Sequence, residues 1–320
     1  MCARIFRCAD TQPHRNLARE EALLLACGAQ SGAALFLWQN AAAVIIGRHQ
    51  NAWRECRCGL LAREGVVLAR RTTGGGAVFH DLGNLNFSFI LPRAEYDLDR
   101  QLGVVCAAVR SFGIACEFSG RNDLLAQGRK FSGNAFRFTR EGALHHGTLL
   151  VCADAERMGR YLRPSPEKLA ARGVASVPSR VVNLSELSAA VTVEALAQAM
   201  EDAFRAEYGP AVREDAENAP WPGYAALAAR NASWAWNYGA TPAFDVAFAH
   251  RFPWGGVELQ LSLAEGRAAD CTVYTDAMDT ELAPRLRAAL TGCRLEAAAL
   301  AEAARLVQAE VADWLAALEI

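Results

Sequence analysis

Short apolar segments of strand length recur through the first half of the chain and constrain its fold most strongly. Residues 34–38 and 43–47 are two of them, separated by the polar turn Gln39-Asn40. Further segments of this kind are residues 1–7, 66–70, 86–91, 123–126, 131–138 and 147–152. We predict that the last three are strands of one mainly antiparallel or mixed sheet.

Helical patterns interrupt these strands. Apolar residues recur at helical spacing in residues 14–27 and again in residues 99–112. Thr192 is placed to cap a further helix that runs to about Tyr208. Strands and helices together predict an α+β fold.

The last part of the chain has its own pattern. Residues 257–263 and 268–274 alternate as strands, and segments rich in alanine and leucine then continue to Ile320. Two strands followed by helices indicate a separate small unit. We therefore predict a large mixed-sheet domain over residues 1–243 and a small α+β C-terminal domain over residues 244–320.

Composition excludes several classes of protein. The 33 Lys and Arg residues are balanced by 35 Asp and Glu residues, which argues against a broadly basic nucleic-acid-binding protein. No apolar stretch reaches the roughly 20 residues that a membrane span needs, and the N-terminus lacks a secretory signal pattern. We expect a cytoplasmic protein that contacts neither nucleic acid nor membrane.

The ten cysteines are scattered along the chain. The close pair Cys56-Arg57-Cys58 does not have the C-x-x-C spacing of zinc or redox sites. We expect all ten cysteines to be reduced thiols, mostly serving as small core residues.

A glycine-rich segment, Thr72-Thr73-Gly74-Gly75-Gly76, follows the arginines at the end of one predicted strand. Glycines let a ligand approach the main chain, and successive N–H groups can bind a phosphate. A tight turn between two strands is an equally good interpretation. The pattern matches neither the phosphate-binding loop with a terminal Lys nor the dinucleotide-binding motif, so a nucleotide site here would be of another type.

Polar residues near this segment are candidates for a site. Lys130 lies beside glycines at the start of a strand, where it can be solvent-exposed or can contact a carboxylate and an α-phosphate together. Asp123 can hold Mg²⁺ or pair with Lys130. His80 is either a base or a structural residue, and Asn84 either contacts a ligand or closes a turn. We interpret His146 as a hydrogen-bonded structural residue.

Residues 163–183 form a long irregular segment. Prolines and a glycine break regular structure there, while Lys168, Arg172 and Arg180 supply positive charge. A loop of this length is usually functional or disordered.

Several of these segments, taken in order, resemble the lipoate–protein ligase A family of bacteria. The resemblance extends over nearly the whole chain, including the C-terminal domain. The segments that carry it are residues 70–89, 119–123, 129–133, 145–150, 176–184, 233–239 and 251–259.

The resemblance implies a fold shared with biotin ligases and distantly with class II aminoacyl-tRNA synthetases. It implies that ATP, with Mg²⁺, activates lipoate to lipoyl-AMP. A lysine of a lipoyl domain then takes the lipoyl group. Acceptors in the family are 2-oxo acid dehydrogenase complexes and the glycine-cleavage H protein. We expect the enzyme to be a monomer.

Site residues follow from matching positions. The family's ATP-binding residues match Arg71, Gly76, Ala77, Val78, Phe79 and Lys130. Its lipoate-binding positions match Arg71, Gly75, His80 and Lys130, and Lys130 is the expected catalytic residue. Asn84, Asp123 and Arg180 are secondary candidates, with Asp123 also a candidate Mg²⁺ ligand. The loop around Lys168 to Arg180 matches one that closes over the adenylate. Thr72-Thr73 and Pro178 depart from the family pattern; threonine keeps the hydroxyl, and the proline would stiffen that loop.

Three alternatives remain open. An octanoyltransferase of the same fold would need a cysteine as acyl carrier, and Cys152 is the candidate. A biotin ligase would use a different acid. A non-catalytic protein could keep the fold and only recognise lipoyl domains.

Overall fold

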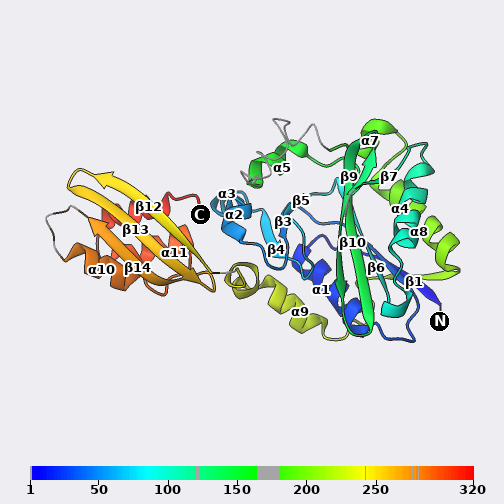
Figure 1. Cartoon of the computed structure of the whole chain (residues 1–320), viewed down its shortest axis with the longest axis horizontal. Coiled ribbons are helices and arrows are strands. Elements are labelled where there is room, and N and C mark those ends of the chain that lie inside the picture. Colours follow the sequence, from blue (N-terminus) through cyan, green and yellow to red (C-terminus); the bar gives the residue numbers. More distant parts are fainter. Residues whose placement is uncertain are drawn as a thin grey trace. The chain divides into compact units, whose positions relative to one another are not determined.

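The structure is a computed structural model that describes residues 2–119, 123–163, 181–241, 243–275, 277, 279 and 281–320 (Figure 1). The chain divides into two compact units. One contains Met1–Arg48 and Ala69–Ala232, and the other contains His49–Leu68 and Ser233–Ile320.

An eight-stranded sheet forms the centre of the first unit, in the order β11-β1-β2-β6-β10-β9-β8-β7. Strand β1 pairs in parallel with β2 and β11, and the remaining pairs are antiparallel. This confirms the predicted mixed sheet. The strands are β1 (Ala3–Arg7), β2 (Ala34–Trp38), β6 (Asn84–Pro92), β7 (Glu117–Ser119), β8 (Asp123–Ala126), β9 (Arg129–Phe138), β10 (Gly142–Leu150) and β11 (Ala211–Asp215).

The central strand β6 explains how the two faces of this sheet differ. Phe87 and Phe89 join the apolar core with α4 (Leu98–Arg110) and α8 (Val193–Tyr208), which lie along one face (Figure 1). The alternate residues Asn86 and Ser88 point to the opposite face, because side chains alternate along a strand. Helix α1 (Pro13–Ala26) lies on that polar face and contacts β6 and β10.

A second small sheet, in the order β4-β3-β5, holds the glycine-rich segment between its outer strands. Its strands are β3 (Ala43–Ile46), β4 (Val67–Arg70) and β5 (Val78–His80). The remaining elements before residue 240 are α2 (Ala52–Glu55), α3 (Cys58–Arg63), η1 (Arg93–Glu95), α5 (Ala155–Tyr161), α7 (Leu184–Leu187), α9 (Tyr224–Ala232) and η3 (Ala235–Gly239).

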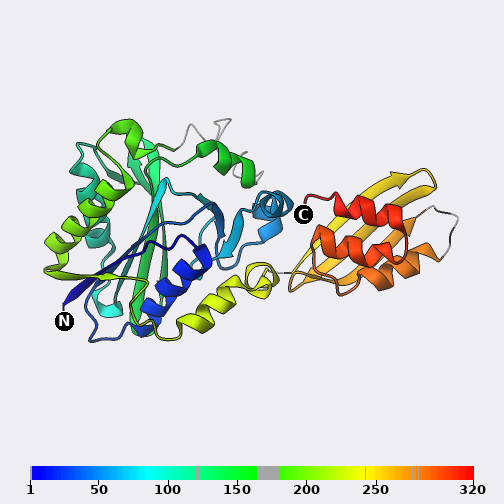
Figure 2. The same ribbon diagram turned by 180° about the vertical axis from the view of Figure 1, so that it is seen from behind.

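The second unit contains an antiparallel sheet of β12 (Phe244–Phe252), β13 (Gly255–Ala264) and β14 (Arg267–Thr275). Helices α10 (Leu282–Leu290), α11 (Ala297–Arg305) and α12 (Ala309–Ala316) cover one face of this sheet (Figure 2). Leu259 and Leu261 of β13 are buried while Gln260 and Ser262 are exposed, as the alternation predicts. The α+β prediction is confirmed for this part, although strand β12 was not predicted.

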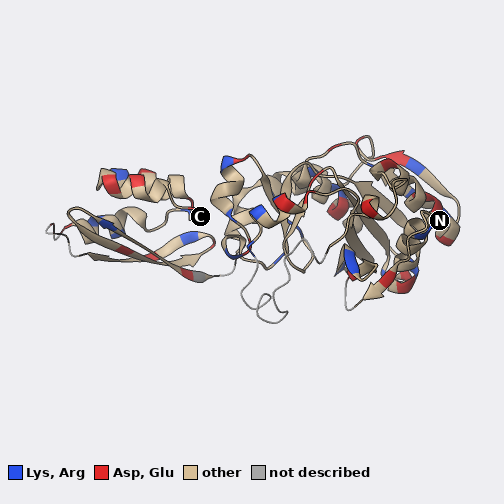
Figure 3. Cartoon of the chain, turned by 90° about the horizontal axis from the view of Figure 1, so that it is seen from above, with Lys and Arg blue, Asp and Glu red and all other residues tan. Residues whose placement is uncertain are grey.

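Charges of both signs are interspersed along the helices (Figure 3). The buried Glu201 of α8, for example, lies between Arg7 at 2.6 Å and Arg205 at 2.9 Å. Among the described residues, no helix is long and apolar enough to cross a membrane.

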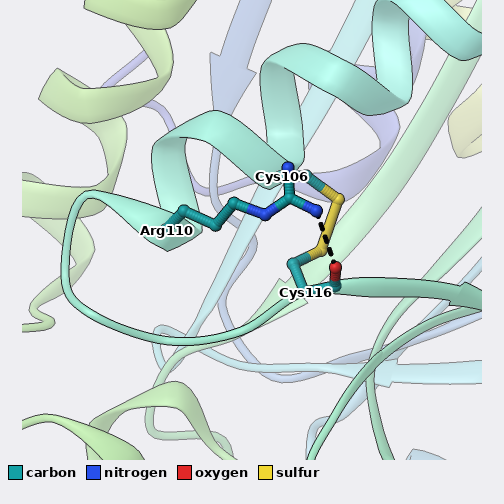
Figure 4. Close-up of a disulfide and its surroundings, with 3 residues drawn as sticks. All are labelled: Cys106, Arg110 and Cys116. Atoms are coloured by element: carbon teal, nitrogen blue, oxygen red, sulfur yellow. Dashed lines mark hydrogen bonds between the residues drawn. A yellow bond between two sulfur atoms is a disulfide. The ribbon is translucent and has the colours of Figure 1, made fainter.

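One expectation about the cysteines is wrong. Cys106 of α4 and Cys116, just before β7, form a disulfide with their Cα atoms 5.5 Å apart (Figure 4). Arg110 donates a hydrogen bond of 3.0 Å to the Cys116 carbonyl in the same turn. The turn after α4 brings together two residues ten positions apart, a proximity that their spacing does not reveal. The other eight cysteines are free.

Candidate functional site

A cavity of about 350 Å³ opens on the polar face of the large sheet in the first unit. Its floor is formed by strands of that sheet, and the glycine-rich segment forms one wall. Residues contributed by the segment and the adjoining strand β5 are Arg71, Gly75, Gly76, Ala77, Val78 and His80.

The cavity floor contains one row of residues that crosses five strands. Trp38 of β2 pairs with Asn86 of β6, which pairs with Thr148 of β10. Thr148 pairs in turn with Gly133 of β9, and Gly133 pairs with Asp123 of β8. All five line the cavity. The row therefore has a charged end at Asp123 and an aromatic end at Trp38.

Lys130 lies at the charged end, with its Nζ 2.7 Å from the Asp123 carboxylate. Its side chain is about a third exposed, at 37%. A Cβ added at Gly133 would meet the Lys130 Nζ at 2.9 Å, so the glycine leaves the space in which the lysine lies. Of the two interpretations of Asp123, pairing with Lys130 is the arrangement present.

The chain returns to this end of the cavity at Val181. Val181 forms a bridge with Lys130, and the Val182 N–H donates to the Lys130 carbonyl at 2.9 Å. Arg180 and the loop expected to close over an adenylate lie outside the described residues. The described chain resumes at Val181, directly beside Lys130.

Arg71 organises the glycine-rich wall. Its guanidinium donates to the carbonyls of Gly74 at 2.6 Å and Gly76 at 2.8 Å, and to the Thr73 hydroxyl at 3.0 Å. Burial lowers the pKa of Arg71 to about 10, and the nearby Glu20 carboxylate acts in the opposite direction. At neutral pH the guanidinium is therefore a buried positive charge in the cavity wall.

Two glycines are required for this wall to pack. Gly75 has φ +90°, in the left-handed region that favours glycine. A Cβ added at Gly47 would lie only 2.3 Å from the Gly75 carbonyl oxygen. Gly74, in contrast, has open space around a Cβ. The three consecutive glycines are therefore not equivalent.

A buried hydrogen-bond network supports the same wall from below. His146 contacts the Thr73 hydroxyl at 2.9 Å and Glu20 Oε1 at 2.7 Å. Ser88 donates to the same Glu20 oxygen at 2.5 Å and accepts from the Trp38 indole at 3.1 Å. Helix α1, strand β10 and the glycine-rich segment are thereby tied together, which agrees with the structural role we expected for His146.

Phe79 and Asn84 do not line the cavity. The Phe79 ring packs against Tyr161, with centroids 5.4 Å apart, and the Asn84 amide donates to the Phe79 carbonyl at 3.2 Å. Asn84 thus holds the turn between β5 and β6, which was one of its two predicted roles. Any contact between Phe79 and ATP would use its main chain.

His80 lines the cavity and is buried. Burial, with Arg71 and His146 nearby, lowers its pKa to about 3. The ring is therefore neutral at physiological pH, and a neutral, buried histidine is poorly suited to act as a general base at that pH.

The His80 shift predicts a pH dependence of stability. The unfolded chain takes up a proton on His80 below pH 6.5, while the folded protein does so only near pH 3, so acid favours unfolding across that window. Between pH 7 and pH 5 this lowers the free energy of unfolding by about 2 kcal/mol. On the same change of pH, the free energy of unfolding of a His80→Leu variant should therefore fall by about 2 kcal/mol less than that of the wild type, as measured by urea unfolding at both pH values. An identical pH dependence in the two proteins would refute the shift.

The described residues at the cavity offer one carboxylate and no preformed metal site. Among the described residues, no group of three or more His, Cys, Asp or Glu side chains is placed to hold a metal. Mg²⁺ commonly binds through one or two carboxylates together with substrate phosphates. Asp123 would supply one such carboxylate to a Mg²⁺ ion that is held mainly by the phosphates of a ligand.

Trp38 and Asn86 are cavity residues that the sequence analysis did not single out. Asn86 lies in a segment with polar and apolar residues alternating, and its buried position between β2 and β10 makes a polar residue there unusual. That alternation was the available signal. It showed which residues share a face but not that this face borders a cavity.

Comparisons with known families match both parts of the chain. The family model described as lipoyl protein ligase A/B catalytic domain matches residues 12–205. The model described as bacterial lipoate protein ligase C-terminus matches residues 241–316. The first match alone covers more than half of the 320 residues.

Comparisons with solved structures agree with the two family matches. The chain is 26% identical to LipL1 of P. falciparum, solved in complex with lipoate, over 98% of this chain and 97% of that one, with a TM-score of 0.65. A bi-partite lipoate protein ligase from Thermoplasma acidophilum, studied with its E2 lipoyl domain, is 24% identical over 75% and 97%, with a TM-score of 0.66. A lipoate-protein ligase A bound with ATP is 24% identical over 75% and 100%, with a TM-score of 0.65. The last two likenesses show the fold alone.

Proposed function

The chain belongs to the lipoyl protein ligase A/B catalytic domain family, and from this premise we propose that it is an ATP-dependent lipoate–protein ligase. It would convert lipoate and ATP to lipoyl-AMP and pyrophosphate. It would then transfer the lipoyl group to a specific lysine of a lipoyl domain.

The observation that carries this proposal is the arrangement of the cavity. One end holds the Lys130 ammonium, and the wall beside it holds the buried Arg71 guanidinium and the glycine main chain. The rest of the floor is uncharged and ends at Trp38. A negatively charged head and an apolar chain would both be accommodated.

Adenylation brings together a carboxylate and a triphosphate, whose negative charges repel each other. Lys130 would contact the lipoate carboxylate and the α-phosphate, and an ammonium can follow charge as it moves between them. In a site with little water each such contact is worth more than in bulk solvent. Holding the two reactants in line can supply a further 7–11 kcal/mol or so. No covalent enzyme nucleophile is required.

Apolar side chains that line the cavity, among them Leu17, Ile45 and Val78, would bind the acyl chain. Burying about seven carbons at roughly 0.8 kcal/mol each contributes about 5–6 kcal/mol. Micromolar binding needs about 8 kcal/mol, so polar contacts at the two ends of the chain must supply the difference.

Lipoyl domains of 2-oxo acid dehydrogenase complexes and the glycine-cleavage H protein are the acceptors that we propose. The Thermoplasma acidophilum ligase, which shares this fold, was studied with its E2 lipoyl domain. That fold likeness supports the proposed class of partner.

Exchange of labelled pyrophosphate into ATP tests the first half-reaction. We expect exchange that requires both lipoate and Mg²⁺ and that does not occur with biotin in place of lipoate. Exchange that occurs with biotin but not with lipoate would make the chain a biotin ligase. Absence of exchange with any acid would favour a non-catalytic protein.

The octanoyltransferase alternative depends on Cys152. That residue is exposed, follows the end of β10, and is not among the described residues that line the cavity, none of which is a cysteine. A Cys152→Ala variant should therefore keep its lipoate-dependent exchange within about twofold of the wild type, since surface substitutions usually have small effects. If the wild type instead transferred an acyl group in the absence of ATP and the Cys152→Ala variant did not, the result would support the transferase.

A further inference from the structure

Two buried polar groups line the part of the cavity that lies beyond Thr148 from Lys130, next to its aromatic end. Asn86 is 1% exposed, and His80 is 3% exposed. Neither atom of the Asn86 amide, nor the His80 Nε2, has a hydrogen-bond partner among the described residues. Buried polar groups are nearly always paired in native proteins, so this pair calls for an explanation.

A chain of hydrogen bonds sets the tautomer of His80. Arg19 donates to Asn16 Oδ1 at 3.0 Å, which fixes the orientation of the Asn16 amide. Asn16 Nδ2 then donates to Asn40 Oδ1 at 3.1 Å, leaving Asn40 Nδ2 to donate to His80 Nδ1 at 3.1 Å. A neutral imidazole that accepts at Nδ1 carries its proton at Nε2. The unpaired His80 atom is therefore an N–H donor.

The position of Asn86 along the cavity matches the length of an eight-carbon acid. The Lys130 ammonium lies over Gly133, and Gly133, Thr148 and Asn86 are neighbours on three adjacent strands. Two strand spacings of about 4.8 Å separate Gly133 from Asn86 by about 10 Å. An extended eight-carbon chain spans about 9 Å. If the carboxylate is held at Lys130, the far end of the chain reaches Asn86.

We infer that Asn86 and His80 select the distal end of the acyl chain, favouring the sulfur-bearing ring of lipoate over the methyl end of octanoate. This inference rests on the proposed ligase function. The ring sulfurs are weak acceptors and polarisable, so they can receive the His80 N–H and the Asn86 NH₂. A methyl group in the same place would leave both donors buried and unpaired, and sites built in this way reject the analogue that lacks the polar group.

The test compares pyrophosphate exchange with lipoate and with octanoate in the wild type and in Asn86→Leu, whose side chain has the same number of heavy atoms and the same branching but no polar atoms. We expect the wild type to favour lipoate in kcat/KM by about tenfold or more. The variant should reduce that ratio by about tenfold, mainly because octanoate improves. A third acid, 8-hydroxyoctanoate, has a polar group at the far end of the chain but no ring, so it separates the effect of polarity from that of ring shape. The wild type should use it at least as well as octanoate, and the variant should use it less well than octanoate.

The matched control is Thr148→Val, which removes a polar group beside the middle of the chain and should leave the lipoate-to-octanoate ratio unchanged. If Asn86→Leu does not fold, Asn86→Val replaces it, because valine suits a central strand. An unchanged ratio in a folded Asn86 variant would overturn the inference while leaving the ligase function intact. Absence of exchange with all three acids in the wild type would instead overturn the proposed function itself.

Discussion

Lys130→Ala should reduce lipoate-dependent adenylate formation by about 10²-fold or more, equivalent to about 3 kcal/mol of transition-state stabilisation. The lysine is the positive group at the charged end of the cavity floor, paired with Asp123 in a slot that Gly133 leaves open. Removing it would leave the repulsion between carboxylate and phosphate unscreened. Single-turnover formation of lipoyl-AMP measures the effect directly.

Arg129→Ala is the matched control for this prediction. Arg129 is the neighbour of Lys130 in β9, but it pairs with Glu186 at 3.6 Å and does not line the cavity. Because exposed ion pairs contribute little, its loss should change both folding and adenylation by less than about threefold. Near-normal lipoyl-AMP formation by Lys130→Ala would remove the central role given to this lysine.

Gly47→Ala should raise the KM for ATP by about tenfold or more. The added methyl would lie 2.3 Å from the Gly75 carbonyl oxygen, which is main chain and cannot turn aside as a flexible side chain would. The glycine-rich wall must therefore shift, and overpacking of this kind costs about 1–3 kcal/mol. Small displacements of a binding wall also reduce rates strongly. The KM for ATP at saturating lipoate is the measurement.

Gly74→Ala is the control for the glycine prediction. Gly74 belongs to the glycine-rich segment itself, yet a Cβ there meets nothing within 4 Å, and its carbonyl would remain available to Arg71. We expect a KM for ATP within about threefold of the wild type. If Gly74→Ala were the more damaging of the two variants, the packing described for this wall would be incorrect.

Much of the fold could be predicted from the sequence because its strands and helices have clear periodicities. Residues 34–38 and 123–126 were predicted as strands, and the structure has these strands with the same bounds. Strand β12 was missed because Ala247, Ala249 and Arg251 give it a weakly apolar, largely exposed pattern. The Cys106–Cys116 disulfide was missed because the spacing of the two cysteines does not show that the chain turns after α4 and brings them together.

The site could be predicted only in part, for a related reason. Lys130 and the glycine-rich segment are recognisable by residue type and local pattern. The row from Trp38 to Asp123 depends on the register between five strands, which single-strand patterns do not fix. The roles of Gly47, Glu20 and Asn86 follow from that register and from contacts between distant segments. Gly47 and Glu20 carry no signal of their own in the sequence, and the alternation around Asn86 shows only which face it shares.

Mass spectrometry of an apo lipoyl domain tests the central claim most directly. The domain would be incubated with the 320-residue protein, lipoate, ATP and Mg²⁺, and in parallel without ATP. The account predicts a mass increase of one lipoyl group on a single lysine, only when ATP is present. An unmodified domain under complete conditions, or modification without ATP, would contradict it.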